Sequence, residues 1–151
     1  MDSPTYKFAI VLSGGLSCGV SINTAAHLAA RLGTLVCQLG GGEVTDGSAT
    51  IHSGIPISPN VILGASQDDL RSRLDKARSL ANGSGLVVLD YPEQGNTTST
   101  DDEYRAALAA AQECDLTYYG FLVYGPRKQV NEVTKGLTLW ACGNTPFMSR
   151  P

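Results

Sequence analysis

The sequence contains no apolar run near the roughly 18 residues that a membrane-spanning helix needs. No signal-peptide pattern precedes Lys7, so we expect a cytoplasmic protein with no membrane partner. Its four cysteines, Cys18, Cys37, Cys114 and Cys142, include no C-x-x-C pair and match no zinc spacing. These absences predict reduced thiols and no bound metal.

Charge is also scarce. Charged residues make up 17% of the chain, and the net charge is -3. A protein that holds nucleic acid through its phosphates usually has a basic surface, so we do not expect nucleic acid as a partner. The glycines include no G-x-x-x-x-G-K-[ST] phosphate loop, and we expect no cofactor.

Length and composition indicate one globular domain over residues 1–151. Hydrophobic residues form 42% of the chain, and no internal repeat is evident. Apolar runs alternate with helical stripes, which predicts an α/β fold. We expect strands at 6–12, 34–39, 60–63, 86–89, 116–124 and 137–141, and helices at 21–32, 66–81, 100–111 and 126–136. The pattern favours a three-layer sandwich, in which helices cover both faces of a mixed, mostly parallel sheet.

More detailed expectations apply to the first predicted helix and to residues 40–59. In the first helix, Ile22, Ala25, Ala26 and Ala29 have the i, i+3, i+4, i+7 spacing of a buried face, and Gly33 closes the helix. Residues 40–59 are rich in Gly, Ser and Thr and predict short strands and loops. The role of His52 within them stays open.

Three stretches together resemble a known group. They are KFAIVLSGGLSCGVSINTAAHLAARLG at 7–33, the run LVVLD ending at Asp90, and YGPRKQVNEVTKGLTLW at 124–140. They are similar to type II peptidyl-tRNA hydrolases, and closer to an uncharacterised sister group, the domain-of-unknown-function family number two thousand. The resemblance implies the peptidyl-tRNA hydrolase II-like fold and a possible homodimer.

One departure from the hydrolase pattern matters. Type II hydrolases carry a lysine just after the glycine of the first loop, and this chain has Val20 there. An ammonium can polarise a carbonyl, whereas an isopropyl group cannot. Peptidyl-tRNA hydrolysis is therefore the weakest of the functions that we consider.

Candidate catalytic residues follow the first predicted strand. Cys18 lies in the loop before the first helix, where the helix dipole would favour a thiolate nucleophile; the alternative is a small residue in a tight turn. Asn23 and His27 share one helical face, so His27 could act as general base while Asn23 orients a substrate. Alternatively, His27 is a packed residue with one ring nitrogen satisfied. Ser13, in the loop after the strand, is a candidate substrate ligand.

Asp90 ends a predicted buried strand, and ligands in open α/β sheets usually lie at such strand ends. It matches the position of an aspartate in the type II hydrolases, and Thr117 resembles a second site residue of that family. The alternative for Asp90 is a carboxylate that simply opens the turn before Pro92.

Arg127 and Lys128 begin a predicted helix, where two cations oppose the helix dipole. That placement suits a bound anion, although salt bridges to Asp101 or Glu103 would also explain it.

The sequence predicts an enzyme without cofactor that acts on an amide, ester or imine carbon of a small-molecule substrate. The reaction would be hydrolysis, isomerisation or cyclisation, with Asp90, His27 and Cys18 as catalytic residues. The alternative is a non-catalytic module that binds an anionic ligand or a partner protein through Arg127 and Lys128.

Overall fold

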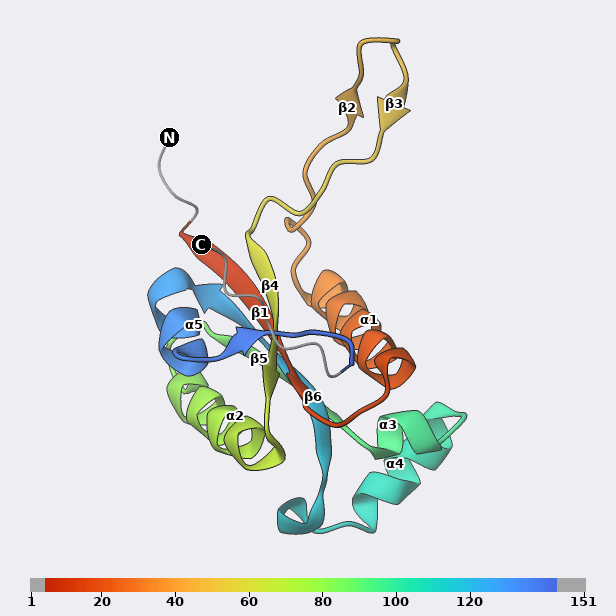
Figure 1. The fold of residues 1–151 in the computed structure, drawn as a ribbon, viewed down its shortest axis with the longest axis vertical. Coiled ribbons are helices and arrows are strands. Elements are labelled where there is room, and N and C mark those ends of the chain that lie inside the picture. Colours follow the sequence, from red (N-terminus) through yellow and green to blue (C-terminus); the bar gives the residue numbers. More distant parts are fainter. Residues whose placement is uncertain (1–4, 144–151) are drawn as a thin grey trace.

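The computed structural model describes residues 5–143 and contains a mixed five-stranded sheet (Figure 1). The strands lie in the order β5-β6-β1-β4-β7. Their bounds are β1 Tyr6–Ser13, β4 Asn60–Ala65, β5 Val87–Pro92, β6 Tyr118–Pro126 and β7 Thr138–Leu139.

The α/β class and the mixed sheet are confirmed, but the expectation of mostly parallel pairing is wrong. Within residues 5–143 only β1 and β4 pair in parallel, because β6 returns antiparallel between β1 and β5 and β7 returns antiparallel beside β4. An apolar run indicates that a strand is buried, but it does not indicate whether the neighbouring strand is parallel or antiparallel.

Helices cover both faces of the sheet. Alternate side chains of β1 point to opposite faces, so Ile10 packs with α1 (Cys18–Leu35) while Val11 packs with α2 (Gln67–Ala81) and α5 (Arg127–Thr134). Figure 1 shows α1 on one side of the sheet and α2 with α5 on the other.

Helix α1 differs from its prediction in length and in its buried face. Ser17 caps it by accepting from the Val20 N–H, and the helix runs through Gly33 to Leu35, so the predicted stop at Gly33 and the strand at 34–39 are wrong. The buried residues are Ser21, Thr24, Leu28 and Leu32, whereas Ile22 is 60% exposed.

The close approach of α1 to the sheet explains this choice of face. A Cβ on Gly120 of β6 would lie 3.1 Å from Thr24 Cγ2 and 2.8 Å from the Val11 carbonyl oxygen. Small side chains are therefore required where α1 crosses β6, and the Ser21–Thr24 stripe supplies them. The helical spacing fits the predicted face with Ile22 and the observed face with Ser21 and Thr24 equally well, so spacing alone does not determine which face is buried.

The remaining helices largely agree with the predictions from the sequence. Ser66 caps α2 by accepting from the Asp69 N–H, and α5 buries Val130 and Val133. Thr100 caps α4 (Asp101–Ala109) by accepting from the Glu103 N–H, and the Glu103 carboxylate accepts from the Ser99 N–H. Two short helical turns, α3 (Gln94–Thr97) and a 3-10 turn at Glu113–Asp115, complete the set.

Residues 40–59 form an arm that projects from the body of the molecule (Figure 1). Its hairpin pairs β2 (Val44–Thr45) with β3 (Ile51–His52). Asp46 holds the turn, since its carboxylate accepts from two backbone N–H groups and lies 2.9 Å from His52 Nε2. The hydrogen bond from His52 is the main cause of a lowered Asp46 pKa. His52 therefore has a structural role in the arm.

No helix within residues 5–143 is long and apolar enough to cross a membrane.

Candidate functional site

A cleft of about 780 Å³ follows the free edge of β5. Helices α1 and α4 and the turn α3 supply its other walls. It brings together His27 and Asp90, two residues that the sequence singled out from segments far apart in the chain. The lining residues are His27, Leu28, Arg31, Val88, Leu89, Asp90, Tyr91, Gly95, Thr98, Ser99, Thr100, Asp101, Tyr104 and Arg105.

The cleft wraps around the edge strand. Asp90 and Tyr91 are successive residues of β5, so their side chains leave opposite faces of the sheet. Tyr91 lies on the α1 face, where its ring centroid is 5.3 Å from that of His27. Asp90 lies on the α2 face. Among the described residues no hydrogen bond joins His27 to Asp90, so the two would act on a ligand from separate walls.

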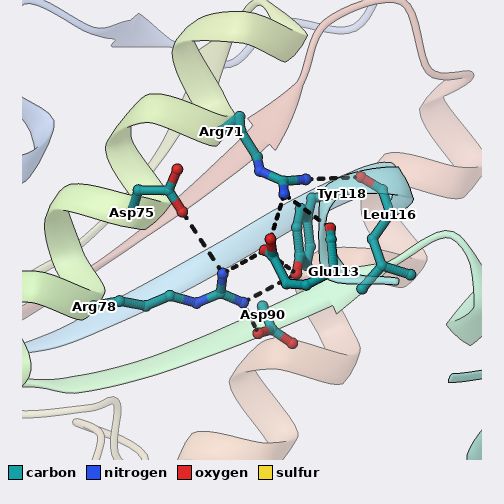
Figure 2. Close-up of polar contacts among 7 residues, drawn as sticks. All are labelled: Arg71, Asp75, Arg78, Asp90, Glu113, Leu116 and Tyr118. Carbon is teal, nitrogen blue, oxygen red and sulfur yellow. Dashed lines mark hydrogen bonds and ion pairs between the residues drawn. The ribbon is translucent and has the colours of Figure 1, made fainter. Parts of the chain in front are cut away.

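Arg78 of α2 anchors Asp90 in a polar network (Figure 2). Its Nη2 lies 2.6 Å from Asp90 Oδ2 and donates to the Tyr118 hydroxyl at 3.0 Å, and its Nη1 donates to Glu113 Oε1 at 2.9 Å. Burial alone would lower the Arg78 pKa, but the hydrogen bonds that Arg78 donates to these three partners raise it above its ordinary value. The guanidinium stays charged and stabilises the negative charge on Asp90.

Two tyrosines give the cleft neutral hydroxyl groups. Burial raises the pKa of Tyr91, whose hydroxyl donates to the Gly95 carbonyl at 2.8 Å. Burial, followed by the negative charge of Asp90, raises the pKa of Tyr104. Both phenols therefore keep their protons at neutral pH and are hydrogen-bond donors. Tyr104 was not singled out from the sequence as a site residue, and only the structure shows that it lines the cleft.

Cys18 is bonded to Cys142 in a disulfide that joins the start of α1 to the segment after β7. The prediction of reduced thiols is wrong for this pair, whereas Cys37 and Cys114 are free and exposed. A disulfide-bonded sulfur has no thiolate to act as nucleophile, so the catalytic role predicted for Cys18 is corrected here. Spacing along the chain could not reveal the pairing.

Three further predicted residues lie outside the cleft. Asn23 donates to Asn96 Oδ1 of α3 at 3.3 Å. Ser13 lines a second hollow of about 620 Å³ at the end of β1. The Thr117 carbonyl accepts from the Glu93 N–H and holds the chain after β5.

Arg127 and Lys128 are exposed at the start of α5. Strand register places them at the opposite end of β1 from Ser13, because Pro126 pairs with Tyr6. Lys7 lies nearby and donates to Asn131 Oδ1 at 2.6 Å. Burial, followed by the positive charge of Arg127, lowers the Lys7 pKa.

Residues 5–143 contain no cluster of three or more His, Cys, Asp or Glu side chains that could hold a metal ion. The polar side chains that line the β5 cleft carry one imidazole, two carboxylates, two phenols, two guanidinium groups and three Ser or Thr hydroxyls.

The comparison with family models identifies the chain. Residues 6–141 match the model described as "Protein of unknown function (DUF2000)", and the chain belongs to this family. It is also similar to a solved structure of a protein of unknown function from Agrobacterium tumefaciens strain C58. The identity is 22%, the TM-score is 0.80, and the match covers 92% of this chain and 100% of that one, which shows a shared fold. No curated protein matches the chain.

Proposed function

We propose that the protein is a cofactor-independent enzyme that uses acid/base catalysis on an amide, ester or imine carbon of a small molecule bound in the β5 cleft. The observation that carries this proposal is the shared cleft of His27 and Asp90, which also contains the neutral Tyr104 phenol. A volume of about 780 Å³ is within the usual range of small-molecule sites.

Each wall of the cleft would have its own task. The Tyr104 hydroxyl would donate to the substrate carbonyl or imine nitrogen, where negative charge develops. Asp90 would accept from a substrate N–H through Oδ1, since Arg78 engages Oδ2. His27 would take the proton from attacking water, or from the substrate itself, and return it to the leaving atom. No covalent intermediate on Cys18 is needed.

The test is turnover of a panel of N-acyl amides, nitrophenyl esters and cyclic imines by the purified chain. We expect His27→Gln to lower turnover by about 10²-fold or more, because an amide cannot transfer the proton. Asp90→Asn should lower it at least roughly tenfold by weakening substrate alignment. His52→Gln is the matched control, since that histidine lies on the arm. Wild-type rates in both cleft variants would remove the proposal.

The arrangement of the helices and the sheet leads to a proposal about the fold. We propose that the α1 layer, the sheet and the α2–α5 layer form the three-layer sandwich of the type II peptidyl-tRNA hydrolases. Helices on both faces support this. Val20 in place of the family lysine still argues against peptidyl-tRNA as the substrate. Deacylation of an N-blocked aminoacyl-tRNA by the purified chain would reverse that judgement.

An anion-binding module is the second candidate function. The effect of Arg127 on the Lys7 pKa supports it, because two positive charges lie close together there. Titration calorimetry with inorganic phosphate would test it. Arg127→Ala should weaken phosphate binding at least roughly tenfold, as expected for loss of a charged hydrogen bond. Lys135→Ala, at the other end of α5, should leave binding unchanged.

A homodimer, expected from the family resemblance, has a candidate interface on the arm. Val44, Ile51, Ile55 and Ile57 are between 59% and 80% exposed there, and large exposed apolar patches often mark protein interfaces. We propose that a second copy of the chain covers these side chains. The cytoplasmic location expected from the sequence is a separate proposal, under which the Cys18–Cys142 disulfide would be exposed to reduction.

A further inference from the structure

The second hollow lies where two adjacent parallel strands end. The chain leaves β1 for α1 on one face of the sheet and leaves β4 for α2 on the other. Such a switch in direction opens a crevice beyond the carboxyl ends of the strands, which is a usual place for ligands. The hollow has a volume of about 620 Å³.

Its floor is mostly backbone. The Gly14 N–H donates to the Ala65 carbonyl at 2.7 Å and ties the two strand ends together. Gly15 has a φ of 85°, which favours glycine, and Gly64 lies against Trp140, with a Cβ position 3.8 Å from Trp140 Cα. The lack of side chains at these glycines would let a flat ligand approach the backbone closely.

The walls of the hollow select against charged ligands. Among residues 5–143 no Lys, Arg, Asp or Glu lines it, and the first turn of α2 beside it carries Asp68 and Asp69, which oppose a phosphate group. Trp140 lines the hollow, and an indole ring is a group on which an aromatic ligand can stack. The Ser66 and Thr138 hydroxyls can form hydrogen bonds with ring nitrogens or an amide.

The disulfide joins the two opposite walls. One wall consists of Gly14, Gly15 and Leu16, just before Cys18. The other wall consists of residues 138–141 and Gly143, on both sides of Cys142. The second wall also contacts the sheet through the short strand β7, the hydrogen bond from the Trp140 N–H to the Ile62 carbonyl, and the packing of Trp140 against the core. We propose that this hollow binds a small, uncharged heteroaromatic ring, and that the Cys18–Cys142 disulfide keeps its walls at the binding distance.

A dithiol reductant would break the Cys18–Cys142 disulfide. Its two thiols transfer two electrons and two protons, the S–S bond breaks, and Cys18 and Cys142 become thiols while the reductant closes to its own disulfide. The wall that contains Trp140 then loses its covalent link to the start of α1, so ligand affinity falls. The site is separate from the β5 cleft, and its test does not depend on the acid/base proposal.

Trp140 is the single tryptophan of the chain, so its indole N–H signal in a ¹H–¹⁵N correlation spectrum reports on this hollow alone. The experiment titrates the oxidised full chain with nicotinamide, with adenine and with inorganic phosphate. We expect a saturable shift of the indole signal with at least one of the two rings and none with phosphate. Addition of a dithiol should raise the Kd at least tenfold.

The variants separate the disulfide from general effects of reduction. Cys142→Ser should bind the ring as weakly as the reduced wild type, with or without a dithiol. A Cys37→Ser/Cys114→Ser double variant should bind like the oxidised wild type, because both of those cysteines are free. The proposal is overturned if neither ring shifts the indole signal, if phosphate shifts it as strongly, or if reduced and oxidised protein bind equally.

Discussion

The Cys18–Cys142 disulfide should supply a large part of the folding stability. It joins residues 124 apart in sequence, so it closes almost the whole chain into a loop in the unfolded state. The loop-entropy relation gives roughly 5 kcal/mol for a loop of this length, and measured values are typically about 2–4 kcal/mol. Cys142→Ser should therefore lower Tm by roughly 5–15 °C, since about 1 kcal/mol corresponds to 2–4 °C at this chain length.

The assay is thermal and urea unfolding followed by far-ultraviolet circular dichroism, with and without a dithiol. Thiol titration of the denatured, oxidised chain should find Cys37 and Cys114 only. The Cys37→Ser/Cys114→Ser variant is the matched control and should unfold close to the wild type. The reasoning is refuted if all four cysteines titrate as thiols, or if Cys142→Ser unfolds at the same urea concentration as that control.

Three other predictions follow from the contacts. Arg78→Met should lower the unfolding free energy by about 1–2 kcal/mol, because it removes several partly exposed contacts. Arg105→Met removes one exposed i,i+4 pair and should unfold close to the wild type, and an equal loss of unfolding free energy in both variants would contradict the role of the Arg78 network. The hydrogen bond from Arg78 lowers the Glu113 pKa below 4.5. The stabilisation from this bond is therefore present above pH 4.5 and is lost as pH falls through the lowered pKa. The urea midpoint should fall more between roughly pH 6 and pH 3 in the wild type than in Arg78→Met. Ile55→Glu with Ile57→Glu should convert a dimer to a monomer in light scattering, and an unchanged mass would rule out the arm as the interface.

Several parts of the fold could be predicted from local sequence. The apolar run at 6–12 becomes the central buried strand, and Ser66 and Thr100 cap the helices that they precede. Val130 and Val133 lie on the buried side of α5. These features depend on contacts between residues two to four positions apart, so the sequence pattern reports them directly.

The candidate site was predictable only in part. His27 and Asp90 were identified from a helical face and a strand end, and the structure brings both to one cleft. The contributions of Arg78 and Tyr104 were missed, because α2 and α4 meet β5 only in the folded chain. No local pattern marks a guanidinium 12 residues from its carboxylate as the partner of that carboxylate.

The amino-acid order by itself determined the main helices and strands, because their periodicity and caps are local. Only the tertiary structure decided that β6 lies antiparallel between β1 and β5, that α1 buries Thr24 instead of Ile22, and that Cys18 meets Cys142. Each of these outcomes depends on groups that are distant in the chain. Their contacts are selected by the packing of the whole core, where shape and close approach outweigh local preference.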